Sequence, residues 1–230
     1  MSYVTEELEQ ILPGCLIDAG REKLIVCEKK EMGTQDQRES ALIERLKETI
    51  RTHHHPTEEY SWHHQTPSSP VTGDDLAQAE IQLGFELPSF LRRVYLEVGN
   101  GGFGPGYGLF PLNTHSSSID SLVTAYLAMR SMSQEDSDEH WTDEEEKPVL
   151  WPERVLMLCD WGCNIYSCLD CSSSDLPIFR MDSNVSFVEW AIEASSFQQW
   201  LEMWADGKPL FHLDWKQATK VSASHLGKAF

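Results

Sequence analysis

The stretch LAQAEIQLGFELPSFLRRVYLEVGNGGFGPGYGLFPL, residues 76–112, decides the fold. Apolar residues recur at helical spacing in two segments, and each segment has its own start and stop signals. The first helix begins at a capping box made by Thr72 and Asp75 and ends at Gly84. The second opens at Pro88 and ends where the glycines begin. The sequence therefore predicts two helices followed by a glycine-rich turn that enters a strand. The predicted helices span 72–83 and 88–98, and the strand lies within 107–112.

Residues 99–104 match the pattern G-x-G-x-x-G, which in dinucleotide-binding proteins marks a loop that holds phosphates. Such a loop follows a strand and opens a helix, whose first amide groups bind the phosphate. Here the glycines follow a helix, Pro105 and Gly106 prevent another from starting, and no lysine follows to make a Walker loop. We therefore interpret the glycines as structural. Gly99 to Gly102 are expected to end the helix in left-handed conformations.

The rest of the chain contains both helical and strand patterns. Amphipathic spacing predicts further helices, the first of them with Asp36 as its N-cap, and short apolar runs predict strands. The predicted helices span 38–51, 119–129 and 196–206, the predicted strands span 154–161, 164–170 and 177–182, and weaker strand signals lie at 15–27 and 210–215.

Taken in order, these motifs resemble the SUKH superfamily, the Smi/Knr-type family of yeast cell-wall-assembly regulators and bacterial toxin-immunity proteins. The family pattern is an acidic residue on a short helix, then LG and LP, a helix, and a turn ending in NGG. The later stretches CDWGCNIYSCLD (159–170) and SFQQWLEMWADG (196–207) also resemble it. The resemblance covers residues 38–207, about three quarters of the chain. The matching positions are Glu80, Leu83, Gly84, Leu87, Pro88, Asn100, Gly101, Gly102, Asp160, Trp161, Gly162 and Asp170.

The resemblance implies an α+β fold, in which several helices pack against a bent, mostly antiparallel or mixed sheet. It implies no catalysis and no cofactor, and the sequence contains no G-x-S-x-G, H-E-x-x-H or Walker pattern. Bacterial members are commonly immunity proteins that bind and block toxins, and eukaryotic relatives are binding hubs. We expect an optional N-terminal extension at 1–35, a SUKH-like domain at 36–207 and a C-terminal segment at 208–230.

The charge of the chain restricts its partners. Its 37 acidic and 18 basic residues give a net charge of −19, and residues 53–150 alone hold 16 acids and 4 bases. Such a surface repels nucleic acid and anionic lipid, so a partner chosen by electrostatics is basic. No apolar run approaches the roughly 20 residues of a membrane span, and the first residues do not resemble a signal peptide. We therefore expect a cytoplasmic protein with reduced cysteines.

Two residue clusters invite a metal interpretation. Cys159, Cys163, Cys168 and Cys171 could bind Zn²⁺ as four thiolates, but they lie in or beside predicted strands rather than on the tight turns of a zinc knuckle. Buried, reduced cysteines are the ordinary alternative. The second cluster is His53, His54, His55, His63 and His64. No acid lies next to these histidines in the sequence, and we expect them to be surface or packing residues.

Binding is better supported than metal chemistry. Aromatic residues on the glycine-bearing turns could be exposed anchors for a partner, or could pack beneath the turns. The acidic segment, defined as residues 135–147, holds eight acids and one lysine, and it could steer a basic partner or form a solvated loop. The candidate partner-binding residues are Phe103, Tyr107, Trp161, Glu144 and Glu145.

Three functions fit these observations. The first is an immunity protein that neutralises a basic toxin domain, such as a nuclease, by stoichiometric binding. The second is a non-enzymatic regulatory adaptor of the same fold with a housekeeping partner. The third is a zinc–thiolate protein. The sequence favours the first and names neither the partner nor the oligomeric state.

Overall fold

The computed structural model describes residues 34–52, 67–113, 121–135, 141–143, 147–210 and 217–228. The chain divides into two units, Met1–Arg38 and Glu39–Phe230, and the fold described below is that of the second unit. The strand signal at 15–27 and the histidines between 53 and 64 lie outside the described residues, as does most of the signal at 210–215. Among the helices of the described residues, none is both long and apolar enough to cross a membrane.

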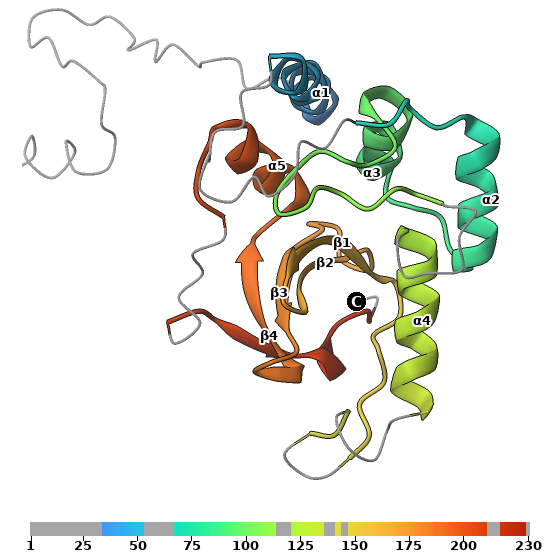
Figure 1. Ribbon diagram of the computed structural model, residues 1–230, viewed down its shortest axis with the longest axis vertical. Helices are drawn as coiled ribbons and strands as arrows, with labels where there is room; N and C mark the ends of the chain where they lie inside the picture. Colours follow the sequence, from blue (N-terminus) through green and yellow to red (C-terminus); the bar gives the residue numbers. More distant parts are fainter. Residues whose placement is uncertain are drawn as a thin grey trace, which may run out of the picture. The chain divides into compact units, whose positions relative to one another are not determined.

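The sheet has five strands in the order β1-β2-β3-β4-β5, and each strand pairs antiparallel with the next (Figure 1). This confirms the expected α+β fold with an antiparallel sheet. The strands predicted at 154–161, 164–170 and 177–182 are present, and the structure adds two that were not predicted. The bounds are β1 Val155–Gly162, β2 Ile165–Asp170, β3 Ile178–Asp182, β4 Ser186–Ala194 and β5 Lys220–Ser222. The prediction of a strand within 107–112 is wrong, because this stretch forms only an isolated bridge between Leu109 and Cys159.

The helices lie where the amphipathic patterns predicted them. The helix expected at 88–98 is present as a short α-helix followed by one π-helical stretch. The bounds are α1 Gln35–Arg51, α2 Gly73–Leu83, α3 Ser89–Arg93, η1 Val94–Val98, α4 Leu122–Glu135, α5 Phe197–Ala205 and the 3₁₀ turn η2 Ala223–His225.

Two helix starts illustrate what local sequence determines. Thr72 and Asp75 form the predicted capping box of α2, and Gly84 ends that helix at φ 80°. The prediction of Asp36 as the N-cap of α1 is wrong, because Thr34 accepts the hydrogen bond of Gln37 N (3.3 Å) and Gln37 Oε1 accepts that of Thr34 N (2.8 Å). The cap lies two residues earlier than predicted, since Gln37 can close the same reciprocal box.

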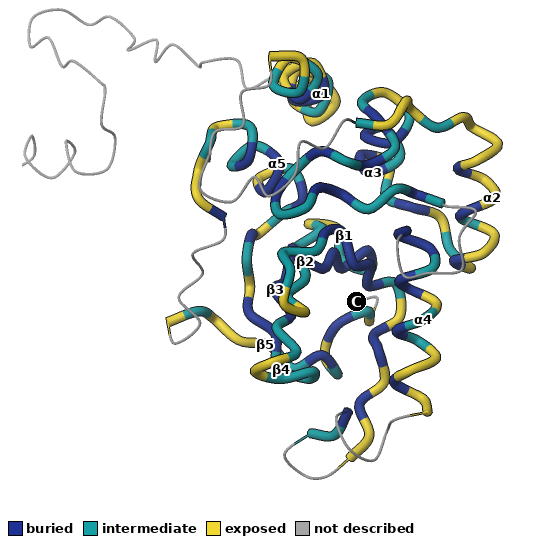
Figure 2. Tube along the Cα trace, in the orientation of Figure 1, coloured by how far each residue is buried: buried dark blue, intermediate teal, exposed yellow. Residues whose placement is uncertain are grey.

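The core is rich in large aromatic side chains. In Figure 2 the buried colour follows β1, whereas the outer side of α2 is exposed. Helix α4 packs along β1, and α5 contacts β4. The Trp151 ring lies 6.0 Å from that of Trp141 and 5.0 Å from that of Trp190, centroid to centroid, and all three are essentially inaccessible to solvent. Aromatic burial on this scale supplies much of the folding free energy.

The C-terminal segment belongs to the same unit. Strand β5 pairs with β4, and Ala223 and Leu226 are buried in the core. Gly227 N donates a hydrogen bond to Asp170 Oδ2 (3.3 Å), which ties the segment to the end of β2.

The glycine-rich turn covers the outer edge of β1. Tyr107 N donates to Asp160 O and Phe110 N donates to Leu158 O, each at 2.8 Å, and Leu109 forms an antiparallel bridge with Cys159. Within the glycine motif itself, Asn100 N donates to Ser68 O (3.1 Å) and Gly102 N donates to Leu109 O (2.9 Å), so protein carbonyls use these amides, which agrees with a structural role and not with a phosphate loop. Gly101 and Gly102 have the expected left-handed conformation, at φ 72° and 74°. The expectation for Gly99 is wrong, because its φ of 169° is extended.

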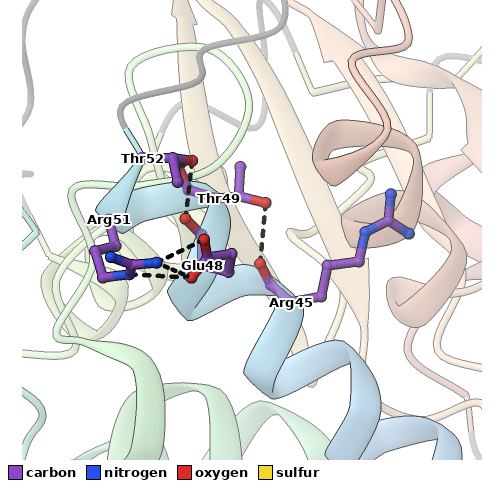
Figure 3. A network of polar contacts seen from close by, with 5 residues as sticks. All are labelled: Arg45, Glu48, Thr49, Arg51 and Thr52. Atoms are coloured by element: carbon purple, nitrogen blue, oxygen red, sulfur yellow. Dashed lines mark hydrogen bonds and ion pairs between the residues drawn. The ribbon is translucent and has the colours of Figure 1, made fainter.

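Helix α1 neutralises its own charges near its C-terminus (Figure 3). Arg51 forms an ion pair with Glu48 (2.7 Å), and the hydroxyls of Thr49 and Thr52 donate to the helix carbonyls of Arg45 and Glu48. The Arg45 guanidinium instead pairs with Asp206, the residue that follows α5. Arg45, Lys47 and Arg51 of this helix are thus paired with acids of the same unit.

Candidate functional site

The first group of motif residues holds α2 to α3. Glu80 Oε1 accepts a hydrogen bond from Leu87 N (2.8 Å), and the same oxygen lies 3.4 Å from Arg92 Nε. Gly84 ends α2 and lets the chain reverse, so that Leu87 and Arg92 can both reach the Glu80 side chain. The acidic residue of the motif therefore acts as a clamp on the connection between the helices, and Pro88 is the residue immediately before α3.

The second group holds the glycine-rich turn. Asn100 Oδ1 accepts a hydrogen bond from Leu112 N (2.6 Å), and Asn100 N donates to Ser68 O (3.1 Å). A Cβ on Gly101 would lie 2.5 Å from Leu109 O, so the two sides of the turn approach too closely for any other residue. These residues are structural, and they place the chain at 106–107 against the end of β1.

At that end of β1 the structure brings together two of the predicted binding residues. A Cβ on Gly162 would lie 2.8 Å from the Tyr107 hydroxyl oxygen, and one on Gly106 would lie 3.2 Å from Trp161 Cδ2. We call these four residues and Asp160 the aromatic turn surface. Tyr107 and Trp161 are both half-buried, so neither is part of the fully buried core.

Asp160 adds a half-buried carboxylate to this surface. Its Oδ1 accepts a hydrogen bond from Gly162 N (2.6 Å) at the register shift near the end of β1. Burial raises the pKa of the Asp160 carboxyl above its usual value, and the hydrogen bond from Gly162 opposes this shift. Burial raises the pKa of Tyr166 on β2, and the nearby Asp160 carboxylate adds to this shift.

A family model described as the SMI1 / KNR4 family (SUKH-1) matches residues 70–203, more than half of the chain. This chain belongs to that family. The match begins just before the capping box of α2 and ends within α5, so it includes the clamp, the glycine-rich turn and β1 to β4. The resemblance stated from the motifs is confirmed. A comparison with curated proteins gives no match.

Phe103 does not share the exposure of its neighbours in this SUKH-1 chain. Its side chain is 3% exposed, and its ring centroid lies 6.3 Å from that of Trp204. Phe103 therefore packs beneath the turn, the second of the two roles considered for it, and its buried ring is not available to a partner. Trp204 supplies the reason, because the apolar face of α5 lies beside this part of the turn.

Beneath Trp161 lies a buried ion pair that sequence reasoning missed. Arg180 Nη2 and Nε donate to the two carboxylate oxygens of Glu193 (2.8 and 3.1 Å), and both side chains are almost fully buried. Ser167 Oγ and Trp200 Nε1 donate to the same carboxylate at 2.6 and 2.8 Å. The sequence did contain a sign of this pair, because Arg180 lies inside β3 and Glu193 inside β4, and a charge buried in a strand requires a partner.

Trp161 forms the outer cover of this network. Its Nε1 donates to Ser167 Oγ (2.8 Å), and its ring centroid lies 4.5 Å from Arg180 Cζ. Arg180 Nη2 also donates to Leu210 O (2.8 Å), beyond the end of α5. The network therefore positions Trp161, and every polar atom of the Glu193 carboxylate has a donor. Such a saturated arrangement favours a structural role over a reactive one.

A pocket lies between α2, the turn at Asn100 and α4. Its volume is about 390 Å³, and its lining is mainly polar side chains with no basic residue among those described. The side-chain amides of Gln78 and Gln82 form no hydrogen bond with any described residue. The lining residues are Ser69, Pro70, Val71, Asp75, Gln78, Gln82, Asn100, Leu112, Asn113 and Thr124.

The four cysteines do not form a common site. Cys159, Cys168 and Cys171 are buried, whereas Cys163 is exposed in the turn between β1 and β2. Burial raises the pKa of the three buried thiols, which keeps them protonated at neutral pH. Among the described residues, no group of three His, Cys, Asp or Glu side chains could hold a metal ion. The geometry thus gives the zinc alternative no support.

The acidic segment has one buried anchor. Trp141 is 1% exposed, and its ring lies 5.2 Å from that of Phe187, so this part of the segment is not a solvated excursion. Asp143 N donates to Lys147 O, and Lys147 N donates to Asp143 Oδ1, both at 2.9 Å. Glu144 and Glu145 lie between these two residues and outside the described part of the chain.

Proposed function

We propose that this chain is an immunity protein, which neutralises a toxin domain by binding it in a stoichiometric complex without chemistry of its own. The observation that carries the proposal is membership of the SMI1 / KNR4 (SUKH-1) family, because that family fits immunity and regulatory roles. The saturated hydrogen bonds of the buried Glu193 carboxylate are consistent with a structural role for this network.

The charge of the chain selects the chemistry of the partner. A net charge of −19 gives a long-range negative potential, which accelerates encounter with a basic protein and slows encounter with an acidic one. Nuclease domains present basic surfaces to nucleic acid. A nuclease toxin is therefore the class of partner that this charge fits best.

The aromatic turn surface is the proposed contact region. Tyr107 on the glycine-rich turn and Trp161 near the end of β1 are partly exposed aromatics, the kind of residue that dominates binding energy at interfaces. Asn184 Nδ2 donates to Cys163 O (2.5 Å), which joins the turn after β3 to the turn after β1. Val185, 57% exposed, extends the same end of the sheet with an apolar side chain.

The proposal is tested with a toxin domain recovered from the source cells by its binding to this chain. We expect one equivalent of the chain to abolish the activity of that domain. Tyr107→Ala should weaken the complex by at least about fivefold, because a truncated aromatic anchor costs more than about 1 kcal/mol. Ile81→Ala is the matched control, since Ile81 is 74% exposed on α2. A partner that is not a toxin, or activity that survives excess chain, would favour the regulatory adaptor.

The acidic segment offers a separate test of steering. Neutralising Glu144, Glu145 and two neighbouring acids to amides should mainly lower the association rate, and the effect should shrink at high salt. Long-range attraction is screened beyond about 8–10 Å at physiological ionic strength, which is the reason for the salt dependence. Association that ignores both the substitutions and the salt would show that the segment is a passive loop.

A further inference from the structure

Arg154 stands at the start of β1 with a constrained backbone. Its φ of 58° lies in the left-handed region, which is costly for a residue with a long side chain. Its carbonyl accepts a hydrogen bond from Cys171 N (2.9 Å), and its amide donates to the Tyr126 hydroxyl (3.4 Å). The backbone is therefore held on both sides in a conformation that the residue would not choose alone.

The guanidinium of Arg154 lies over an aromatic ring and has no acidic partner among the described residues. Its Cζ lies 5.3 Å from the centroid of the Phe85 ring, which in turn packs edge-on against Tyr126 (5.8 Å between centroids). Nε is buried with no hydrogen-bond partner among the described residues, and no described residue makes a hydrogen bond or ion pair with the Nη atoms. The adjacent Glu153 pairs with Arg130 instead (3.4 Å).

This arrangement is unusual for the chain. Acids outnumber bases by two to one, and six of the seven other described arginines contact a carboxylate, the exception being Arg38, which is exposed on α1. These pairs are Arg45–Asp206, Arg51–Glu48, Arg92–Glu80, Arg93–Glu97, Arg130–Glu153 and Arg180–Glu193. Where acids are so abundant, a positioned guanidinium without an acid marks a place suited to an external anion.

We propose that Arg154 is the receptor for a carboxylate of the bound protein partner, an inference whose biological meaning rests on the proposed function. The planar fork of a guanidinium matches a carboxylate in two parallel hydrogen bonds, and the Arg154 guanidinium lies over the Phe85 ring. A singly charged carboxylate fits better than a phosphate dianion, because Glu153 and the charge of the whole chain repel the second charge.

The site would add specificity to a complex driven by opposite net charges. A basic toxin that carries an acid opposite Arg154 gains a directed ion pair, whereas one that carries a lysine there meets a like charge. Long-range attraction between the net charges of the two proteins cannot make this distinction, since it does not depend on which residue of the toxin faces Arg154. Arg154 would therefore decide which of several basic toxins binds.

The site is tested first without any toxin. In ¹⁵N NMR spectra, the Nε–H resonance of Arg154 should shift saturably with sodium acetate and not with sodium chloride at the same ionic strength. The Nε–H resonance of Arg130, which already contacts Glu153 and Trp151 O, is the internal control and should not shift saturably. Arg154→Met should abolish saturable binding. Equal shifts at the two arginines, or tighter binding of inorganic phosphate than of acetate, would overturn the assignment.

The complex provides the second test. Arg154→Met should weaken binding of the recovered toxin at least tenfold, while Arg130→Met should change it by less than threefold. Arg154→Glu should weaken binding further, and exchanging the facing partner carboxylate for lysine should restore binding to this variant, which would identify the carboxylate. Failure to find a toxin would refute the proposed function and leave the acetate result standing, so the two failures are distinguishable. An Arg154→Met complex as tight as the wild type would overturn the partner role.

Discussion

Arg180 and Arg154 show two opposite ways of holding a guanidinium in the same protein. Arg180 lies under Trp161, donates to both oxygens of Glu193 and to Leu210 O, and is 3% exposed. Arg154 lies over Phe85 with a buried Nε that meets no acceptor among the described residues. Both make a cation–π contact, so the aromatic ring does not distinguish them.

The difference teaches which charge serves the fold and which is suited to binding. A buried charge whose hydrogen bonds are all made has no donor left for an external ligand. Removing its partner leaves an uncompensated buried charge. A charge held in position with donors unused contributes little to stability and remains able to bind. Equivalent substitutions at the two positions should therefore have very different consequences.

The largest expected effect is that of Arg180→Met. This change leaves the Glu193 carboxylate, only 2% exposed, without its cation, and we expect a loss of about 3–5 kcal/mol in the free energy of unfolding. Lys220→Met is the control, because Lys220 and Glu189 form an exposed pair whose loss should cost less than about 1 kcal/mol. Urea denaturation measures both. Equal losses would end the distinction between a structural and an exposed pair.

The glycine-rich turn, which lies against the Trp161 cover, should be the next most sensitive region. Gly101→Ala places a Cβ 2.5 Å from Leu109 O at a φ of 72°, so we expect a loss of at least about 2 kcal/mol. Gly84→Ala has a similar φ of 80° but nothing within 4 Å of the added atom, so it should cost about 1 kcal/mol. If the two variants unfold at the same urea concentration, the close approach has no energetic weight.

Asp160 lies between the two extremes, because it is a half-buried charge with one strong hydrogen bond. Its pKa is raised on folding, so the fold favours the protonated form, and ionisation lowers stability as pH rises through the carboxyl range. Asp160→Asn removes that dependence. The variant should gain stability relative to the wild type, by less than about 1 kcal/mol, between pH 3 and pH 7. A difference that stays constant over this range, or that falls, would contradict the shift.

The smallest expected effect on stability is that of Arg154→Met. Methionine keeps the apolar contact with Phe85 and removes the buried Nε without an acceptor, so the free energy of unfolding should change by less than about 0.5 kcal/mol. Thermal and urea denaturation beside Arg180→Met give the direct comparison. A loss as large as that of Arg180→Met would show that Arg154 is structural and would remove the contrast.

Local patterns predicted most of the fold. The capping box of Thr72 and the left-handed Gly84 follow from neighbouring residues, and both were predicted correctly. Strand β4 was missed because Glu189 and Glu193 interrupt its apolar pattern. Only the register with β3 and the contact with α5 show that Glu193 points toward a buried arginine and a tryptophan. The candidate site was predicted in part, since Tyr107 and Trp161 lie together while Phe103 is core.

By itself the sequence determined the family, the order of the helices and central strands, and the strongly acidic character of the chain. These properties depend on residue type and short spacing, and hydrogen bonds and apolar periodicity act over a few residues. Tertiary structure alone decided which charges meet. Arg180 is separated from Glu193 by 13 residues and from Leu210 by 30, whereas no described acid pairs with Arg154. Such pairing depends on strand register and helix packing, because the cost of burying a charge is set by whatever the folded chain places beside it.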